Sequence, residues 1–358
     1  MAGALQKAGA AARGAAAGAA GAAGAAGAAG AGVGAGAGRA AAPAAQFFDI
    51  AANLTDGMFA RGEYHGKAYH EPDGDLVLER AWAAGVRRIM VTGGALAESR
   101  EALDLARRDP RLVCTVGVHP TRCSEFEAAP EGGAAHLDAL LALAREGQAE
   151  GKCAAVGECG LDYARLQFCP KETQQAWFRA QFGLAESTGL PMFLHLRDAA
   201  DDFLQILHEN RARFSQAVVH SFDGSLETLE RLLAFDGVSV GVNGCSLRTE
   251  ENLAVAARIP ADRLMLETDA PWCEVKNSHA GSKFLTGPRP AAKEKKKFQR
   301  GLPVKGRNEP AGIAQVLEVL AGARGEEPGA LAAQVYENSC KMFRVPALER
   351  GGAPGRGL

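Results

Sequence analysis

Short apolar runs recur along the chain from residue 47 onward. Eight of them have the length of a β-strand: 47–54, 87–93, 112–118, 154–159, 190–195, 217–222, 237–243 and 263–269. Most are apolar at every position instead of every second position, which is typical of parallel strands buried on both faces. The pattern therefore predicts eight parallel strands.

Segments with helical spacing of apolar residues separate these runs, at 74–84, 97–108, 135–146, 171–188 and 225–235. Gly85, Gly189 and Gly237 stand at three helix-to-strand junctions, where a glycine commonly ends a helix. Eight strand–helix units in about 300 residues predict an α/β fold, a (β/α)8 TIM barrel forming a single catalytic domain. An open, doubly wound sheet is the alternative, although no glycine-rich phosphate loop follows the first predicted strand.

The first 45 residues differ from the rest, because they consist almost entirely of alanine and glycine and contain no acidic residue. Such a segment has little apolar surface to bury against the entropy cost of folding. We therefore expect a disordered low-complexity extension (1–45), the barrel domain (46–346) and a short disordered tail (347–358). No stretch approaches the ~20 apolar residues of a membrane span, so no membrane contact is expected.

Charge and cysteine content limit the kinds of site that the chain can contain. The chain of 358 residues has a net charge of -2, yet ten Lys or Arg oppose two Glu between Cys273 and Arg307. A basic loop on an acidic body predicts a local anion site, while its KEKKK run (293–297) could also be a solvated loop or a nuclear-import signal. The eight cysteines form no Cys-x-x-Cys pair, and we expect them to be reduced.

Metal-competent side chains stand near the ends of four predicted strands, in VGECGLD (156–162), FLHLRD (193–198), VVHSFDG (218–224) and LETDAPW (266–272). Each histidine alone is most simply a core residue, but an unpaired buried carboxylate costs several kcal/mol. Because barrel strands end at one shared mouth, these side chains are expected to converge there. The predicted ligands of a divalent metal ion are Glu158, His195, His220 and Asp269.

Hydrolysis of a phosphodiester by a metal-activated water is the chemistry that best fits these residues. Asp269 and Glu158 are the predicted catalytic residues: Asp269 ligates metal and takes the proton of the attacking water, and Glu158 can bridge two ions. Four further residues are expected to contact the substrate. These are His119 after the third strand, Arg197 after His195, Arg307 in the RNEP segment (307–310), and Asn53 after the first strand.

From about Phe47 to Val345 the chain resembles the TatD family of metal-dependent deoxyribonucleases, in its eukaryotic branch. The motifs GECGLD, FLHxRD, HSFDG, ETDAPW and RNEP carry this resemblance. It implies a barrel, DNA as substrate, exonuclease-like action, and metal contacts at the four predicted ligands. It also implies one or two divalent cations per subunit, Mg2+ or Mn2+ in the first place and Zn2+ as an alternative; no obligate protein partner is indicated.

The chain departs from the family pattern on its first strand. Many relatives carry Asp-x-His-x-His there, whereas here Asp49 is followed by Ala51 and Asn53. The number of ions held is therefore left open. Two other functions also stay open: hydrolysis of another ester or amide, such as an aminoacyl-tRNA ester, and nucleic-acid binding by a barrel without chemistry. The expected location is the nucleus, with cytoplasm or mitochondrion as alternatives.

Overall fold

Eight parallel strands form a single sheet in this computed structural model, which describes residues 45–287 and 289–348. Nearly all of the two predicted terminal extensions falls outside these ranges, so their disorder stays a prediction. The strands follow one another in the order β1 (Phe47–Ala52), β4 (Val86–Val91), β5 (Leu112–Val116), β6 (Cys153–Asp162), β7 (Met192–Arg197), β8 (Ala217–His220), β9 (Val238–Val242) and β10 (Leu264–Leu266). Two short antiparallel strands of two residues each, β2 (Glu63–Tyr64) and β3 (Lys67–Ala68), form a separate hairpin.

The sheet closes nearly into a barrel where its first and last strands meet. Ala52 and Ala270 form a parallel bridge just beyond β10. The backbone N–H of Asn53 donates to the carbonyl of Ala270 at 2.7 Å, and the N–H of Asp269 donates to the carbonyl of Ala51 at 2.8 Å. The predicted TIM barrel is therefore confirmed.

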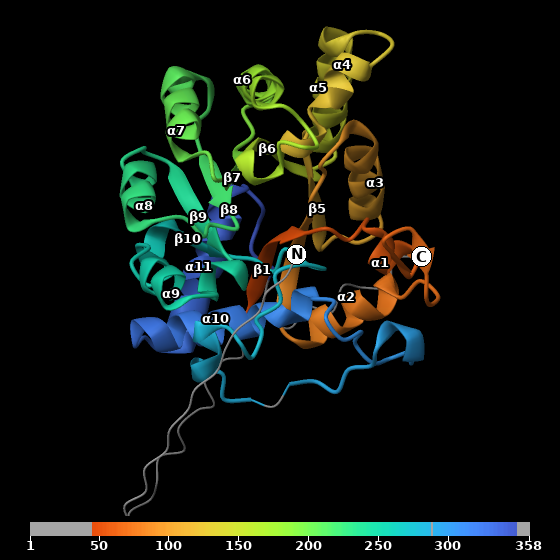
Figure 1. Ribbon diagram of the computed structural model, residues 1–358, viewed down its shortest axis with the longest axis vertical. Coiled ribbons are helices and arrows are strands. Elements are labelled where there is room, and N and C mark those ends of the chain that lie inside the picture. The colour runs from red at the N-terminus through yellow and green to blue at the C-terminus, as the bar shows by residue number, and fades with distance from the viewer. Residues whose placement is uncertain (1–44, 288, 349–358) are drawn as a thin grey trace, which may run out of the picture. The chain divides into compact units, whose positions relative to one another are not determined.

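Helices lie around the strands (Figure 1). The five predicted helical segments correspond to α2 (Gly74–Ala83), α3 (Leu96–Arg107), α5 (Gly133–Ala149), α6 (Lys171–Thr188) and α8 (Leu226–Leu233). The others are α1 (Gly57–Ala60), α4 (Ser124–Ala128), α7 (Ala200–Glu209), α9 (Glu250–Ala256), α10 (Ile313–Arg324) and α11 (Pro328–Met342). Short 3-10 turns add η1 (Pro120–Arg122), η2 (Tyr163–Arg165), η3 (Arg211–Arg213), η4 (Cys245–Leu247), η5 (Ala261–Arg263), η6 (Ala280–Phe284), η7 (Lys295–Lys297) and η8 (Pro310–Gly312).

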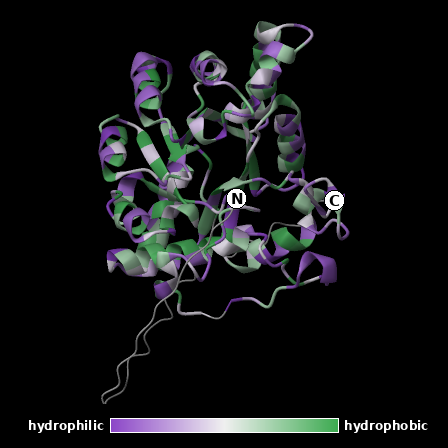
Figure 2. Ribbon diagram, viewed as in Figure 1, coloured by the Kyte–Doolittle hydropathy of each residue, from purple (hydrophilic) through white to green (hydrophobic). Residues whose placement is uncertain are grey.

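Apolar residues concentrate on the strands and polar ones on the outer helices (Figure 2). Within the described ranges, no helix combines the length and apolar character needed to cross a bilayer. All eight cysteines are free thiols, as expected.

The barrel interior is apolar toward the amino ends of the strands. Phe48, Met90, Phe193 and other early strand residues form a buried cluster there, and the end of α11 packs against it. The rings of Phe48 and Phe343 lie 5.7 Å apart. Since this half of the interior is filled by apolar side chains, polar side chains from later strand positions gather at the opposite end, where barrel enzymes place their active sites.

Candidate metal centre

Strand β6 carries two carboxylates on its inner face. Side chains alternate along a strand, so Glu158, Gly160 and Asp162 share one side, while Cys159 and Leu161 point to the outer core under the helices. Gly160 has a φ of 149°, and a Cβ there would lie 2.0 Å from the backbone oxygen of His195. Glycine between the carboxylates is therefore what lets β7 approach this strand.

Strands β7 and β8 place their histidines at the same level. His195 pairs in register with Gly160 on one side and with His220 on the other. Its Nδ1 lies 2.8 Å from Glu158 Oε1, and Nε2 of His220 also lies 2.8 Å from that oxygen. Three predicted ligands thus meet around one carboxylate oxygen, although nothing in these contacts tests their role as ligands.

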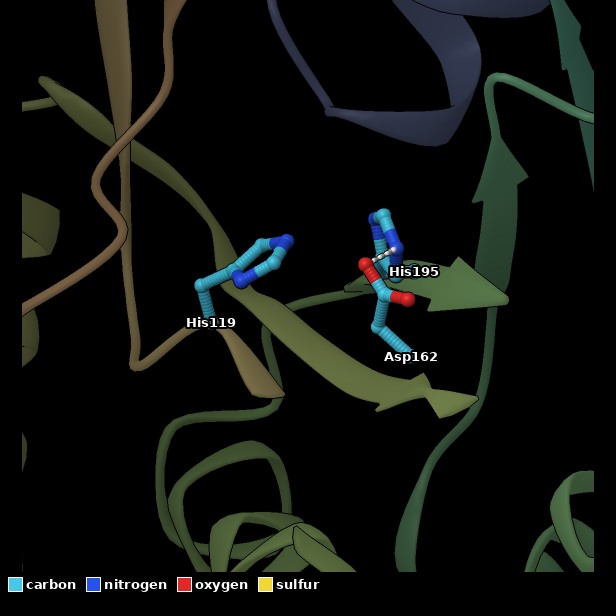
Figure 3. A group of neighbouring side chains, drawn as sticks. All are labelled: His119, Asp162 and His195. Atoms are coloured by element: carbon cyan, nitrogen blue, oxygen red, sulfur yellow. Dashed lines mark ion pairs between the residues drawn. The ribbon is translucent and has the colours of Figure 1, made fainter. Parts of the chain in front are cut away.

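A second group overlaps the first and contains His119, Asp162 and His195 (Figure 3). Nδ1 of His119 accepts from the backbone N–H of Thr121 at 3.1 Å, which leaves Nε2 to face Glu158 Oε1 at 3.4 Å. His195 Nε2 lies 3.4 Å from Asp162 Oδ2. Within each group the potential ligand atoms lie within 4.8 Å of one another, and His195 belongs to both.

Several buried polar atoms of this cluster have no hydrogen-bond partner among the described residues. They are His195 Nε2, His220 Nδ1, Asp162 Oδ1 and Glu267 Oε2. Buried polar atoms are nearly always paired, so such a concentration calls for a bound species. Imidazole nitrogens and carboxylate oxygens are ligands for Zn2+, Mn2+ and Mg2+. The residues present therefore fit a divalent cation.

The members of the cluster differ in the direction in which their pKa values are shifted. Burial lowers the pKa of His119 to about 3, so this imidazole is neutral at pH 7. Burial opposes the charge of His220 too, but Glu158 and Glu267 raise its pKa well above the usual range. Burial would raise the pKa of Glu158, yet His220 and His119 hold it well below its ordinary value. An ionised carboxylate thus sits among the imidazoles.

Asp269 lies at the same mouth but outside both three-residue groups. Its Oδ1 accepts from Asn53 Nδ2 at 2.9 Å, and its Oδ2 accepts from Cys273 Sγ at 3.2 Å. Burial raises its pKa to about 6 against the lowering effect of His220. Its backbone φ of 51° is uncommon for a residue other than glycine, and such backbone is often found at functional sites.

The first strand contributes little to the cavity. Asp49 is fully buried, and its carboxylate accepts from the backbone N–H of Thr268 at 2.9 Å and from its hydroxyl at 2.5 Å. Burial raises the pKa of Asp49 to about 8, although the bonds from Thr268 lower it. Asp49 therefore joins β1 to the end of β10. Asn53 lines the cavity, but its amide already donates to Asp269.

Glu267 is a cluster residue that the sequence reasoning missed. Its Oε1 accepts from the backbone N–H of Ser221 at 2.6 Å and from Asn243 Nδ2 at 2.9 Å, and lies 3.5 Å from His220 Nδ1. A Cβ on Gly241 would come within 2.7 Å of Oε2. The signal was its place in LETD, two residues before Asp269, and the carboxylate can orient the imidazole of His220. Asp162 was likewise present in GECGLD but not selected.

A cavity of about 920 Å³ opens over the cluster. Arg197 lines it with an exposed side chain and makes no ion pair with any described carboxylate, so it is available for an anion. Cys245 and Cys273 also line it, with their sulfurs 2.9 Å apart. Two exposed aromatic rings, Phe168 and Trp272, stand at its edge.

Arg307 is not brought to this cavity. Its side chain is buried, and it donates to both oxygens of Asp73 at 2.6 Å and to Glu309 Oε1 at 3.0 Å. A guanidinium engaged in this way is not available for a phosphate. The basic segment does not line the cavity either beyond Cys273, as far as its described residues show. Instead, Lys295 lies over the rings of Tyr64 and Tyr69.

Comparisons with known proteins agree with this architecture. The model of the family described as TatD related DNase matches residues 48–344. The chain is 43% identical to "Deoxyribonuclease Tat-D" of Schizosaccharomyces pombe over 307 residues, which is 85% of this chain and 98% of the relative. It is 38% identical to "3'-5' ssDNA/RNA exonuclease TatD" of Erwinia billingiae, covering 84% of this chain and 100% of that protein.

Solved structures of similar sequence have the same fold. A TatD family hydrolase from Entamoeba histolytica superposes with a TM-score of 0.77 at 38% identity, covering 84% of this chain and 98% of that one. A Saccharomyces cerevisiae protein described as an uncharacterized amidohydrolase also gives 0.77, at 35% identity and with 84% and 100% coverage. The resemblance seen in the sequence motifs is therefore confirmed, and the chain belongs to the family of TatD related DNases.

Proposed function

We propose that this protein is a divalent-metal-dependent deoxyribonuclease that hydrolyses phosphodiester bonds from the ends of DNA. The observation that carries the proposal is the convergence of Glu158, His195 and His220 at one cavity, with buried nitrogen and oxygen atoms left unpartnered. Membership of a family of DNases supports the substrate class. A relative named as a 3'-5' ssDNA/RNA exonuclease supports action from an end.

Glu158, His195 and His220 would hold the ion, and Asp269, which lines the same cavity, would be a fourth ligand. A bound divalent cation supplies charge stabilisation to the phosphoryl oxygens and lowers the pKa of a coordinated water. The protein supplies the proton acceptor: a pKa of about 6 leaves Asp269 mostly ionised near neutral pH, where a general base works best. Asn53 fixes its orientation through the 2.9 Å hydrogen bond.

Two residues are suited to contact the phosphate. Neutral His119 accepts at Nδ1 from Thr121, so its Nε2 carries the proton and can donate to a phosphate oxygen beside Glu158. Arg197 can pair with a second phosphate in two parallel hydrogen bonds. These groups bind and orient the scissile bond over the carboxylates.

The direct test uses purified full-length protein and end-labelled single- and double-stranded oligodeoxynucleotides. With Mg2+ or Mn2+ we expect stepwise shortening from one end, and EDTA should abolish it. Zn2+ is offered in parallel. Protein that releases no nucleotide with any of the three ions would overturn the proposal.

Metal binding can be measured separately from nuclease activity. We expect one or two Mn2+ ions per subunit by calorimetric titration, and markedly weaker binding after His195→Ala, because this residue belongs to both metal-competent groups. His208→Ala is the matched control, since His208 is exposed on α7 away from the cavity. Equal Mn2+ binding by the two variants would contradict the assignment.

Hydrolysis of another ester or amide is the second candidate. It is favoured by the similarity to the yeast structure described as an amidohydrolase. Ala51 and Asn53 speak against it, because they stand where a cyclic amidohydrolase would usually carry histidines on the first strand. Faster turnover of an aminoacyl-tRNA ester than of DNA would favour this candidate.

Nuclear location is the final part of the proposal. It rests on the Lys-rich run 293–297, in which Lys293, Lys296 and Lys297 are exposed. A fluorescent fusion should accumulate in the nucleus and lose that accumulation when these three lysines are changed to alanine. An unchanged distribution would refute the assignment.

A further inference from the structure

Exposed aromatic side chains gather at the cavity. Four large apolar side chains of the described residues are notably exposed: Leu166 at 42%, Phe168 at 63%, Leu226 at 36% and Trp272 at 45%. Both aromatic members of this set line the cavity, whereas neither leucine does. Keeping an aromatic ring in water forgoes a large burial energy, so two such rings at one mouth indicate a ligand that covers them.

The two rings stand on opposite sides of the mouth. Phe168 lies in the loop that follows β6, and Trp272 lies in the loop that follows β10. These strands are fourth and eighth in the order of an eight-stranded barrel, so the two loops rise on opposite sides. A ligand that contacts both rings must therefore cross the metal-competent cluster.

Both rings are free to receive a planar group, while their backbone is held. Neither ring stacks on another ring or under a cation within the described chain, unlike Trp177, which lies 4.1 Å from Phe126. The backbone N–H of Trp272 donates to the carbonyl of Asp269 at 2.9 Å, and that of Phe168 donates to Arg165 at 3.0 Å. The faces are thus available on anchored turns.

Positive charge lies between the two rings. Arg197 at the end of β7 and Arg248 after η4 line the cavity with exposed side chains. Neither lies within ion-pair distance of a described carboxylate, and the one hydrogen bond that the Arg248 side chain makes to described residues goes to Cys245 Sγ, at 3.1 Å. Two unpaired guanidinium groups beside two free rings match a chain of alternating phosphates and flat bases.

We propose that Phe168 and Trp272 are base-stacking platforms for the unpaired end of a nucleic-acid strand, whose phosphates run between them along Arg197 and Arg248. The inference rests on the proposed nuclease function, and it names the residues that would hold the bases of a single strand, the kind of substrate in the name of the Erwinia billingiae relative. Inside a duplex the bases are already stacked and paired, so only unpaired bases can lie on both rings of one site. The platforms contact bases and not sugars, so DNA and RNA strands both fit.

The test measures binding without hydrolysis. The probe is a fluorescent ten-residue oligothymidylate with phosphorothioate linkages, and the comparison is an abasic strand with the same backbone. Phe168→Ala and Trp272→Ala should each weaken oligothymidylate binding about 5- to 150-fold, the range of one lost base stack. Binding of the abasic strand should change less than about twofold, because it keeps the phosphates but has no base to stack.

Matched variants separate stacking from simple loss of apolar surface. Trp272→Phe should restore most of the affinity, and Trp272→Leu should not, because only an aromatic face stacks on a base. Leu226→Ala, which removes an exposed apolar side chain outside the cavity, should bind both strands like the wild type. Wild-type tryptophan fluorescence should be quenched by oligothymidylate, and Trp272→Phe should lose that quenching.

Equal weakening on the abasic strand, or unchanged binding of oligothymidylate by both alanine variants, would overturn the platforms. That result is distinguishable from failure of the nuclease function. Unchanged binding in variants of an active enzyme rejects the platforms alone. A protein that shows the platform effects but releases no nucleotides rejects the nuclease function alone.

Discussion

The barrel buries two clusters of charged side chains that differ in how completely they are paired. Between α1, α2 and η8, Arg307 joins Asp73 and Glu309, and Arg80 donates to the remaining oxygen of Glu309 at 2.7 Å. At the ends of β6, β7, β8 and β10, by contrast, four buried polar atoms have no hydrogen-bond partner among the described residues, on Asp162, His195, His220 and Glu267, whereas in the first cluster only Arg307 Nε lacks one.

This difference distinguishes a cluster whose charges are paired within the chain from one whose polar atoms remain available to a ligand. Two arginines and two carboxylates balance in charge around Arg307, and removal of any one member leaves the buried charges unbalanced. In the strand-end cluster the missing partners have to come from outside the chain, as an ion, water or substrate. Residue type alone does not make the distinction, since both clusters contain buried carboxylates and cations.

The largest expected effect is the loss of stability when Arg307 is removed from its cluster with Asp73 and Glu309. Arg307→Met would remove both hydrogen bonds to the buried Asp73, leave it only the longer 3.8 Å ion pair with Arg80, and should lower the free energy of unfolding by about 3–5 kcal/mol. Urea denaturation measures this. Arg300→Met, which removes exposed ion pairs with Asp75 and Glu71, should cost at most about 1 kcal/mol. If Arg307→Met has the stability of the wild type but binds DNA more weakly, Arg307 contacts the substrate and this assignment is wrong.

Removing the carboxylate of Glu158, at the centre of the strand-end cluster, should lower activity in place of stability. Glu158→Gln keeps the shape but loses the charge that two imidazoles share, and kcat/KM for DNA should fall at least about 100-fold. Glu186→Gln is the matched control, because Glu186 pairs only with Arg213 on the surface. Activity within threefold of the wild type would show that Glu158 belongs to a structural cluster after all.

A third test concerns Asp49, which is hydrogen-bonded in the core and is protonated there near neutral pH. Its folded pKa of about 8 exceeds the unfolded value of about 3.9, so the folded state holds a proton that the unfolded state loses. Stability from this group is therefore complete below pH 4 and is lost as pH rises to 8. Asp49→Asn should gain stability relative to wild type, by about 2–3 kcal/mol between pH 5.5 and 7.5.

Chemical denaturation at the two pH values measures the difference. Asn mimics the protonated carboxyl, because it can accept from the backbone of Thr268 and donate to its hydroxyl. A difference between the proteins that does not change with pH would mean that Asp49 is ionised in the folded protein throughout this range.

The smallest expected effect lies where the first and last strands of the barrel meet, beside the strand-end cluster. Asn53→Ala removes the 2.9 Å hydrogen bond to Asp269, and kcat/KM should fall roughly 10-fold. Because that bond favours the ionised carboxylate, its loss should raise the pKa of Asp269 above about 6 and move the acidic limb of the pH–rate profile upward. Exposed Asn277→Ala is the control; a uniform loss at all pH values would contradict the positioning role.

The strands were predictable because their signal is local. Each predicted run overlaps an observed strand, since continuous apolar composition in a short segment marks a strand buried on both faces. The main difference is β6, predicted as 154–159 and observed as Cys153–Asp162. Its last residues alternate between polar and apolar because one face borders the cavity and the other the outer core.

The site was predictable only in part. One metal-competent residue was chosen at each strand end, although period-two alternation places Asp162 on the same face as Glu158 and could have identified it. Arg307 shows the limit of this approach. Its partner Asp73 lies 234 residues earlier in the chain, and no local pattern says which way an arginine in a loop will point.

The packing of Phe343 against Phe48 has a consequence for how the protein is made. The floor of the barrel joins the first strand to the end of the last helix, so almost the entire domain must leave the ribosome before Phe48 can be covered. At about 5–20 residues per second, that leaves an apolar strand exposed for tens of seconds. A nascent chain arrested before α11 should therefore bind chaperones, and completion of the last few dozen residues should release it.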